Sequence, residues 1–212
     1  MSILVSARHN TRNILHALGV VAMTVLLGLF TPAMAQNSSP TETVETVVNN
    51  ILEILRNDEL EFEETASMVR AEILSGFDEV AMAQSVLSTN WRSASKEQQE
   101  EFTDLLSRTI EGTYIDGLRA YTNEKVEFRG ETINGTRASV SSVVVMDNGN
   151  VPVVYQLRQR REGWFVYDVV VENVSMVSTY RETYRSIVRR DGMDNLLQQM
   201  RDKLAELEAG KA

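Results

Sequence analysis

Hydrophobic residues recur every three or four positions through the first half of the chain, a spacing that predicts amphipathic helices. The first predicted helix covers about 40–56 and begins at a capping box formed by Ser39 and Glu42. A second is predicted near 62–74, where Gly76 follows as a stop signal.

Two further helices are predicted before the pattern changes. Asp78 is placed to cap a helix that reaches about residue 87. Ser95 and Gln98 form a second capping box, and the apolar stripe behind it continues to about residue 121. This is the longest predicted helix of the chain.

The hydrophobic period then falls to two, which predicts strands. Turn-forming residues at 147–150 and 162–163 connect neighbouring strands closely, so these strands are expected to be antiparallel. The helical period returns at 174–189 and 193–208 and predicts two C-terminal helices. The four predicted strands are 125–130, 137–146, 151–160 and 164–171.

N-terminal helices, a four-stranded antiparallel meander sheet and two C-terminal helices together define an α+β protein. The last strand is apolar on both faces, which implies cover on both sides. We therefore expect an apolar cavity between the sheet and the helices. Strict alternation predicts one face with Trp164, Val166, Asp168 and Val170, and another with Phe165, Tyr167, Val169 and Val171.

The N-terminus has the three parts of a secretory signal peptide. Arg8 and Arg12 precede an uncharged apolar stretch at 17–30, and Ala33-Met34-Ala35 provides a cleavage signal. The alternative, a retained membrane anchor, needs a longer apolar stretch. We expect 1–35 to be cleaved and 36–212 to form one domain in the periplasm.

Composition excludes several classes of function. The leader carries two of the 21 basic residues and none of the 30 acidic ones, so the mature net charge is −11. A basic surface for nucleic acid is therefore not expected. The chain has no Cys, and both of its histidines lie in the leader. We predict no enzyme, no catalytic residues, no metal site and no cofactor, because histidine and cysteine chemistry is missing.

Asp168 is the one residue with an open catalytic interpretation. It stands in an apolar run beside Tyr167, and burial raises the pKa of a carboxyl group enough to make it a base. Alternatively, Asp168 accepts hydrogen bonds and holds its strand in place.

Three motifs resemble the MlaC family, the periplasmic lipid-binding proteins of the Mla pathway, also called the toluene-tolerance auxiliary family. The motifs are "FDEVAMAQSVLSTNWRSASKEQQEEFTDLLSRTIEGTYIDGLRAY", "WFVYDVVVENVSMVSTYR" and "RRDGMDNLL". Asn173 stands where the family usually has Gly, and Asn is the other residue that tolerates a left-handed backbone. The resemblance covers about 78–197.

The resemblance implies a carrier that moves glycerophospholipid between the outer and inner membranes and so maintains outer-membrane lipid asymmetry. Its implied partners are an outer-membrane lipoprotein complex and an inner-membrane MCE-domain ABC transporter. A periplasmic chaperone for outer-membrane proteins remains the alternative. Either tail contact or plain core packing fits the candidate tail-lining residues, which are Leu105, Leu106, Ile110, Tyr114, Val143, Val145, Val153, Tyr155, Leu157, Val166, Val170, Val177 and Tyr180.

An arginine cluster supplies candidates for contact with the lipid headgroup or for partner docking. Arg181, Arg185 and Arg189 are four residues apart, so they lie on one helix face. The alternative interpretation is that they are solvated charges balancing nearby acids. We expect a monomer, because no amphipathic helix is left without a partner.

Overall fold

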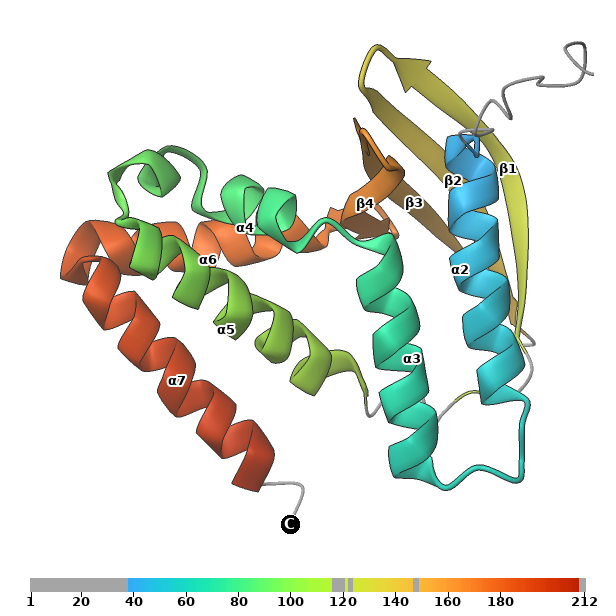
Figure 1. Cartoon of the computed structure of the whole chain (residues 1–212), viewed down its shortest axis with the longest axis horizontal. Helices are drawn as coiled ribbons and strands as arrows, with labels where there is room; N and C mark the ends of the chain where they lie inside the picture. The colour runs from blue at the N-terminus through green and yellow to red at the C-terminus, as the bar shows by residue number, and fades with distance from the viewer. Residues whose placement is uncertain (1–37, 116–120, 122–123, 147–148, 210–212) are drawn as a thin grey trace, which may run out of the picture. The chain divides into compact units, whose positions relative to one another are not determined.

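A computed structural model describes residues 38–115, 121, 124–146 and 149–209. The predicted leader lies outside these residues. The chain has the α+β architecture expected from its sequence, with N-terminal helices, an antiparallel sheet and two C-terminal helices (Figure 1).

The N-terminal helices begin where their caps predict. Ser39 Oγ accepts from Glu42 N at 3.1 Å, and Ser39 N donates to the Glu42 carboxylate at 2.8 Å. Ser95 and Gln98 form the same reciprocal pair. Residues 116–120 lie outside the described part, so the predicted end of the longest helix near 121 is not tested. The elements are α2 (Pro40–Leu55), α3 (Phe62–Gly76), α4 (Glu79–Leu87), η1 (Ser88–Ser93) and α5 (Lys96–Tyr114).

The sheet is an antiparallel meander in the order β1-β2-β3-β4-β5. It contains the four predicted strands and adds a two-residue fifth strand after β4. Two helices close the chain, α6 (Met176–Asp191) and α7 (Met193–Ala209). The strands are β1 (Lys125–Asn134), β2 (Arg137–Met146), β3 (Gly149–Arg160), β4 (Gly163–Val171) and β5 (Val174–Ser175).

The predicted face assignment of β4 is wrong because the strand contains a bulge. Consecutive β3 residues pair with Asp168 and Val166, so Tyr167 has no partner across the ladder. One extra residue shifts the alternation by one position. Val166 therefore shares a face with Val169, whereas Asp168 and Val170 lie on the opposite face.

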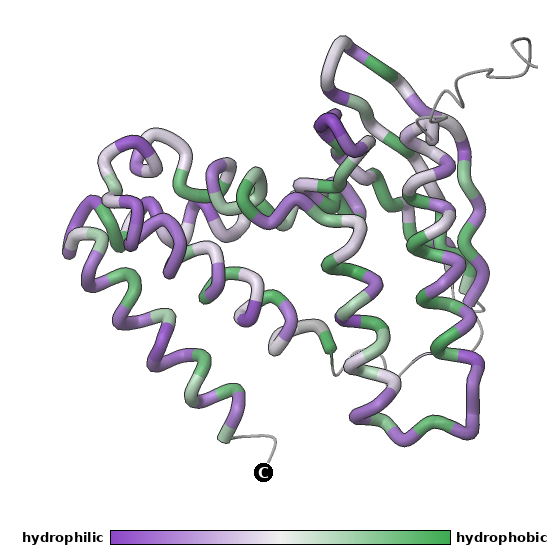
Figure 2. The backbone as a smooth tube through the Cα atoms, in the orientation of Figure 1, coloured by the Kyte–Doolittle hydropathy of each residue, from purple (hydrophilic) through white to green (hydrophobic). Residues whose placement is uncertain are grey.

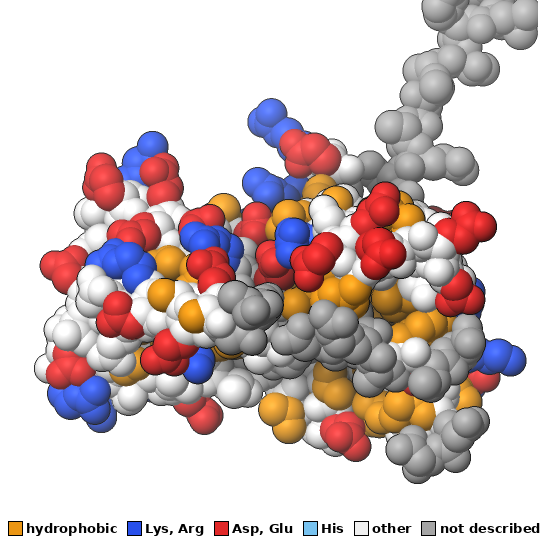
Figure 3. Space-filling model, turned by 90° about the horizontal axis from the view of Figure 1, so that it is seen from below, with side chains coloured by type: hydrophobic (Ala, Val, Ile, Leu, Met, Phe, Trp, Pro, Cys, Tyr) orange, Lys and Arg blue, Asp and Glu red, His pale blue; other side chains and the backbone are white. Residues whose placement is uncertain are grey.

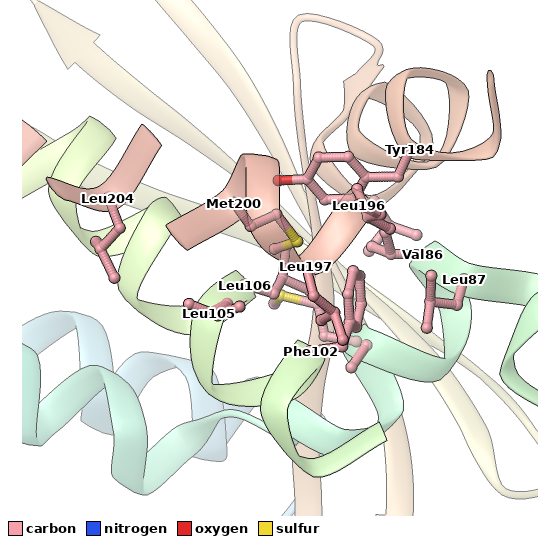
Figure 4. Packing of buried hydrophobic residues seen from close by; sticks show 13 residues of the cluster. Val86, Leu87, Phe102, Leu105, Leu106, Tyr184, Leu196, Leu197, Met200 and Leu204 are labelled. Carbon is pink, nitrogen blue, oxygen red and sulfur yellow. The ribbon is translucent and has the colours of Figure 1, made fainter. Parts of the chain in front are cut away.

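Two separate clusters of buried side chains form the interior. The helical core joins α4, α5, α6 and α7, and Phe102 and Leu196 are completely buried in it (Figure 4). The sheet core joins α2 to the sheet through Val44, Val140 and Leu157. Hydrophobic positions recur along the helices of both regions, as the colouring of Figure 2 shows.

Two helical glycines allow close helix contacts. A Cβ atom at Gly76 would lie 2.7 Å from Val47 Cγ2, so the end of α3 can meet α2 only without a side chain there. A Cβ atom at Gly112 would lie 3.3 Å from Leu207 Cδ1 of α7. Gly76 therefore serves the packing of α3 on α2, at some cost to helix propensity, whereas a small movement of Leu207 would make room at Gly112.

Candidate functional site

One face of the sheet lies against α2 and α3, and we call it the helix-covered face. It carries the residues of β1–β4 that share a side with Val140 and Leu157. The start of α2 is fixed to the edge strand, because Thr41 N and Thr41 Oγ1 both donate to the Glu131 carboxylate at 2.7 and 2.6 Å. From there α2 runs along the sheet toward the beginning of β1 (Figure 1).

The helix-covered face is closed at one end only. Near the start of α2, Val140 and Leu157 are 0% exposed, and Val44 of α2 belongs to the same buried cluster. Toward the beginning of β1, the apolar side chains of the same face are only half-buried. These half-buried residues are Val126, Val144, Met146 and Val151.

The apolar stripe of α2 shows the same gradient. Val44 is buried, but the residues that follow on its side of the helix are half-buried along the rest of its length. Apolar surfaces of helix and sheet thus face each other without complete closure. Seen from below, hydrophobic side chains gather on the part of the molecule that carries α2, α3 and the sheet (Figure 3). The half-buried stripe consists of Val47, Val48, Ile51, Leu52 and Leu55.

The structure divides the thirteen predicted tail-lining residues into groups. On the helix-covered face lie Val153, Tyr155, Leu157 and Val166. In or against the helical core lie Leu105, Leu106, Ile110, Val177 and Tyr180. On the opposite face of the sheet lie Val143, Val145 and Val170. The side chain of Tyr114 lies outside the described part of the structure.

Sequence reasoning passed over the half-buried end of the helix-covered face. Val144 and Val151 are register partners on this face, whereas the predicted Val143 and Val145 point to the other side. The helix over 40–55 lay outside the family resemblance, so its apolar stripe was not among the predicted tail-lining residues. The signal was present in the alternation of β3, which places Val151 on the side of Tyr155 and Leu157.

Tyr155 adds a neutral polar group to the helix-covered face. Burial raises the pKa of the Tyr155 phenol, and a hydrogen bond with Ser142 lowers it by a smaller amount. The phenol therefore stays uncharged at physiological pH, as an apolar site requires.

Asp168 connects the sheet to α6. Its carboxylate accepts a hydrogen bond from Ser175 Oγ at 2.6 Å and another from Val177 N at 3.0 Å. Both carboxylate oxygens therefore accept hydrogen bonds at the start of α6, where a negative charge also interacts favourably with the helix dipole. This geometry matches the structural interpretation of Asp168.

The predicted arginines do not act as one group in the structure. Arg181 Nε donates to Ser85 O at 2.8 Å and so joins α6 to α4. Arg185 and Arg189 are exposed on α6, and no described carboxylate lies within ion-pairing distance of either. Their role in headgroup contact or docking stays a prediction.

Two other features were looked for in the described residues, a cluster of metal ligands and a membrane-spanning helix. Within 38–115, 121, 124–146 and 149–209, no three His, Cys, Asp or Glu side chains gather as metal ligands. No helix in this part of the chain is long and apolar enough to cross a membrane. The incompletely closed apolar layer is thus the main candidate site.

Fold and site together define an α+β protein with an incompletely closed apolar layer between a meander sheet and two helices. The model of the MlaC protein family matches residues 45–202. The chain therefore belongs to the MlaC family.

Named relatives agree with this membership. The chain is 25% identical to the intermembrane phospholipid transport system binding protein MlaC of Haemophilus influenzae, over 66% of this chain and 68% of that protein. It is 28% identical to the toluene tolerance protein ttg2D of Pseudomonas putida, over 55% of this chain and 56% of that protein.

A solved structure shares the fold. It is the phospholipid-binding protein of Ralstonia solanacearum in complex with a phospholipid, with a TM-score of 0.74 and 22% sequence identity. The match covers 81% of this chain and 99% of that one.

Proposed function

We propose that this protein is a phospholipid carrier that holds acyl chains between the helix-covered face and α2 and α3. The observation that carries the proposal is the half-buried end of this face, where apolar side chains of the sheet and of α2 face each other but remain partly exposed. Family membership and the phospholipid named for the Ralstonia structure support the same cargo.

The energetics favour a carrier with this kind of layer. Two acyl chains hold about 30 methylene groups, and each gains about 0.8 kcal/mol on leaving water, so a free lipid faces a cost of about 24 kcal/mol. The apolar side chains of this layer that are only partly buried are available to offset this cost. No chemical step is needed, and the protein acts without enzymatic activity.

The proposed route crosses the periplasm, between an inner-membrane MCE-domain ABC transporter and an outer-membrane lipoprotein complex. The predicted leader over 1–35 supports export, and the names of the relatives support intermembrane transport. Movement of glycerophospholipid along this route maintains the lipid asymmetry of the outer membrane. The carrier acts as a monomer.

Two neighbouring valines on β2 provide a matched test. Val144 lies on the helix-covered face and Val145 on the opposite face, and both are half-buried. We expect Val144→Asp to reduce bound phospholipid at least about tenfold, because a carboxylate is costly to bury beside acyl chains. Val145→Asp should retain the lipid. Mass spectrometry of lipid extracted from gently purified protein gives the stoichiometry.

Thermal unfolding of both variants serves as the control for folding. Equal lipid loss in two well-folded variants would place the cargo elsewhere. Wild-type protein that carries no lipid and takes none from liposomes would remove the proposal altogether.

A further inference from the structure

A polar pocket lies where α4 meets the sheet. Its volume is about 270 Å³, and it is partly open to solvent. Polar side chains dominate its lining, which includes Arg137, Arg158, Tyr167, Gln84, Gln159 and Ser85. We call it the arginine pocket.

The arginine pocket is separate from the proposed lipid layer. Arg137 and Arg158 are register partners on β2 and β3, on the face opposite Val140 and Leu157. Arg137 is also seven residues along β2 from Val144, a distance of about 23 Å at the rise of a strand. A lipid held at the half-buried end does not account for this pocket.

Positive charge is in excess around the pocket. Arg158 and Arg160 share a single carboxylate, Asp78, with nitrogen–oxygen distances of 3.4 Å each. No described carboxylate lies within ion-pairing distance of Arg137. Like charges directly opposite on neighbouring strands are destabilising. An anion between Arg137 and Arg158 would remove this repulsion, in a protein that is acidic elsewhere.

The donors of the pocket are held in place before any ligand arrives. Arg137 donates to Tyr167 Oη at 3.0 Å, and its guanidinium lies 5.5 Å from the centre of the Tyr167 ring. The Tyr167 hydroxyl accepts this bond, so its own proton is available to a ligand. The side-chain amide of Gln84 on α4 forms no hydrogen bond with any described residue, and it supplies a further donor.

We infer that the arginine pocket binds a phosphoryl anion, either free phosphate or the phosphate of a membrane lipid headgroup. Guanidinium groups match phosphate oxygens in pairs. Donors come from α4, β2, β3 and β4, an arrangement that suits a tetrahedral group with several acceptor oxygens better than a planar carboxylate. The inference does not depend on the acyl-chain site and stands if that proposal fails.

Titration of purified protein with inorganic phosphate at constant ionic strength tests the inference. We expect saturable binding by calorimetry, with acetate binding more weakly. Arg137→Gln should weaken phosphate binding at least about tenfold, because one charged donor pair is lost. Tyr167→Phe keeps the ring against Arg137 and should weaken binding by a smaller factor. Arg129→Gln is the matched control, since Arg129 is an exposed arginine of β1 already paired with Glu127.

Vesicles containing phosphatidate separate the two sources of phosphate. Vesicle binding that free phosphate displaces, and that Arg137→Gln abolishes, assigns the pocket to lipid headgroups. Phosphate binding without vesicle binding assigns it to a small soluble anion. Absence of phosphate binding, equal losses in Arg137→Gln and Arg129→Gln, or stronger binding of an acidic peptide than of phosphate would each overturn the inference. Unchanged lipid content in Arg137→Gln would show that the two sites are independent.

Discussion

The helical core and the layer between sheet and α2 use similar side chains but are closed to different degrees. In the helical core, α5 is covered by α4, α6 and α7, and leucines and aromatic rings fill the space between them (Figure 4). In the sheet layer, α2 seals one end and leaves Val126, Val144 and Val151 half-buried. Apolar composition alone therefore does not separate a structural core from a binding surface. The two regions differ instead in how completely neighbouring helices and strands cover their apolar side chains.

The largest expected effect compares a residue of each region. Phe102 is completely buried, and its ring meets Tyr184 edge-on at 5.8 Å. We expect Phe102→Ala to lower the free energy of unfolding by about 3–5 kcal/mol, whereas the half-buried Val144→Ala should cost about 1 kcal/mol or less. Urea unfolding of lipid-free protein measures both values.

Phe102→Leu serves as the control, because it keeps most of the buried volume and should cost less than the alanine variant. A Val144→Ala loss as large as that of Phe102→Ala would mean that the sheet layer is as tightly packed as the helical core. The contrast between the two regions would then fail.

The parts of the fold that depend on local sequence were predicted well. Ser39 and Ser95 begin helices because each cap bonds to residues only three positions away, and the turn residues at 162–163 join two strands directly. The bulge at Tyr167 depends on how β3 pairs with β4, so alternation within β4 alone could not reveal it.

The candidate site shows the same limit. Leu105 and Leu106 fit a cavity wall as well as a core until the position of α7 is known, and α7 covers them. In the sheet, neighbours such as Val144 and Val145 have the same side chain and opposite faces. Pairing across strands, which a single segment does not encode, decides which of them meets the helices.

The second prediction concerns the link between the regions. In Asp168→Asn, the amide oxygen can accept only one of the two hydrogen bonds now made by Ser175 and Val177, and the charge at the start of α6 is lost. We expect a loss of about 1–2 kcal/mol in unfolding free energy. Lipid content should remain at the wild-type level, since Asp168 lies on the face opposite the proposed site. Urea denaturation and lipid extraction on the same preparation measure both outcomes. Loss of lipid transfer with unchanged unfolding free energy would instead favour a chemical role for Asp168.

The smallest expected effect is seen only at alkaline pH, and it compares a tyrosine of each region. Burial raises the pKa of Tyr184 in the helical core, with a further contribution from Tyr180, and burial raises the pKa of Tyr155 in the sheet layer less strongly. A phenol in the unfolded chain loses its proton near pH 10, before the folded phenol does, so each group stabilises the fold fully below about pH 10 and this contribution is lost as pH rises.

By about pH 11 the loss due to Tyr184 should be about 1 kcal/mol, and Tyr184→Phe should remove it. Tyr155→Phe should remove less, because its hydrogen bond with Ser142 offsets part of the effect of burial. Urea unfolding between about pH 8 and 11 measures the slopes, and an equal change of slope in the two variants would show that both regions exclude water equally.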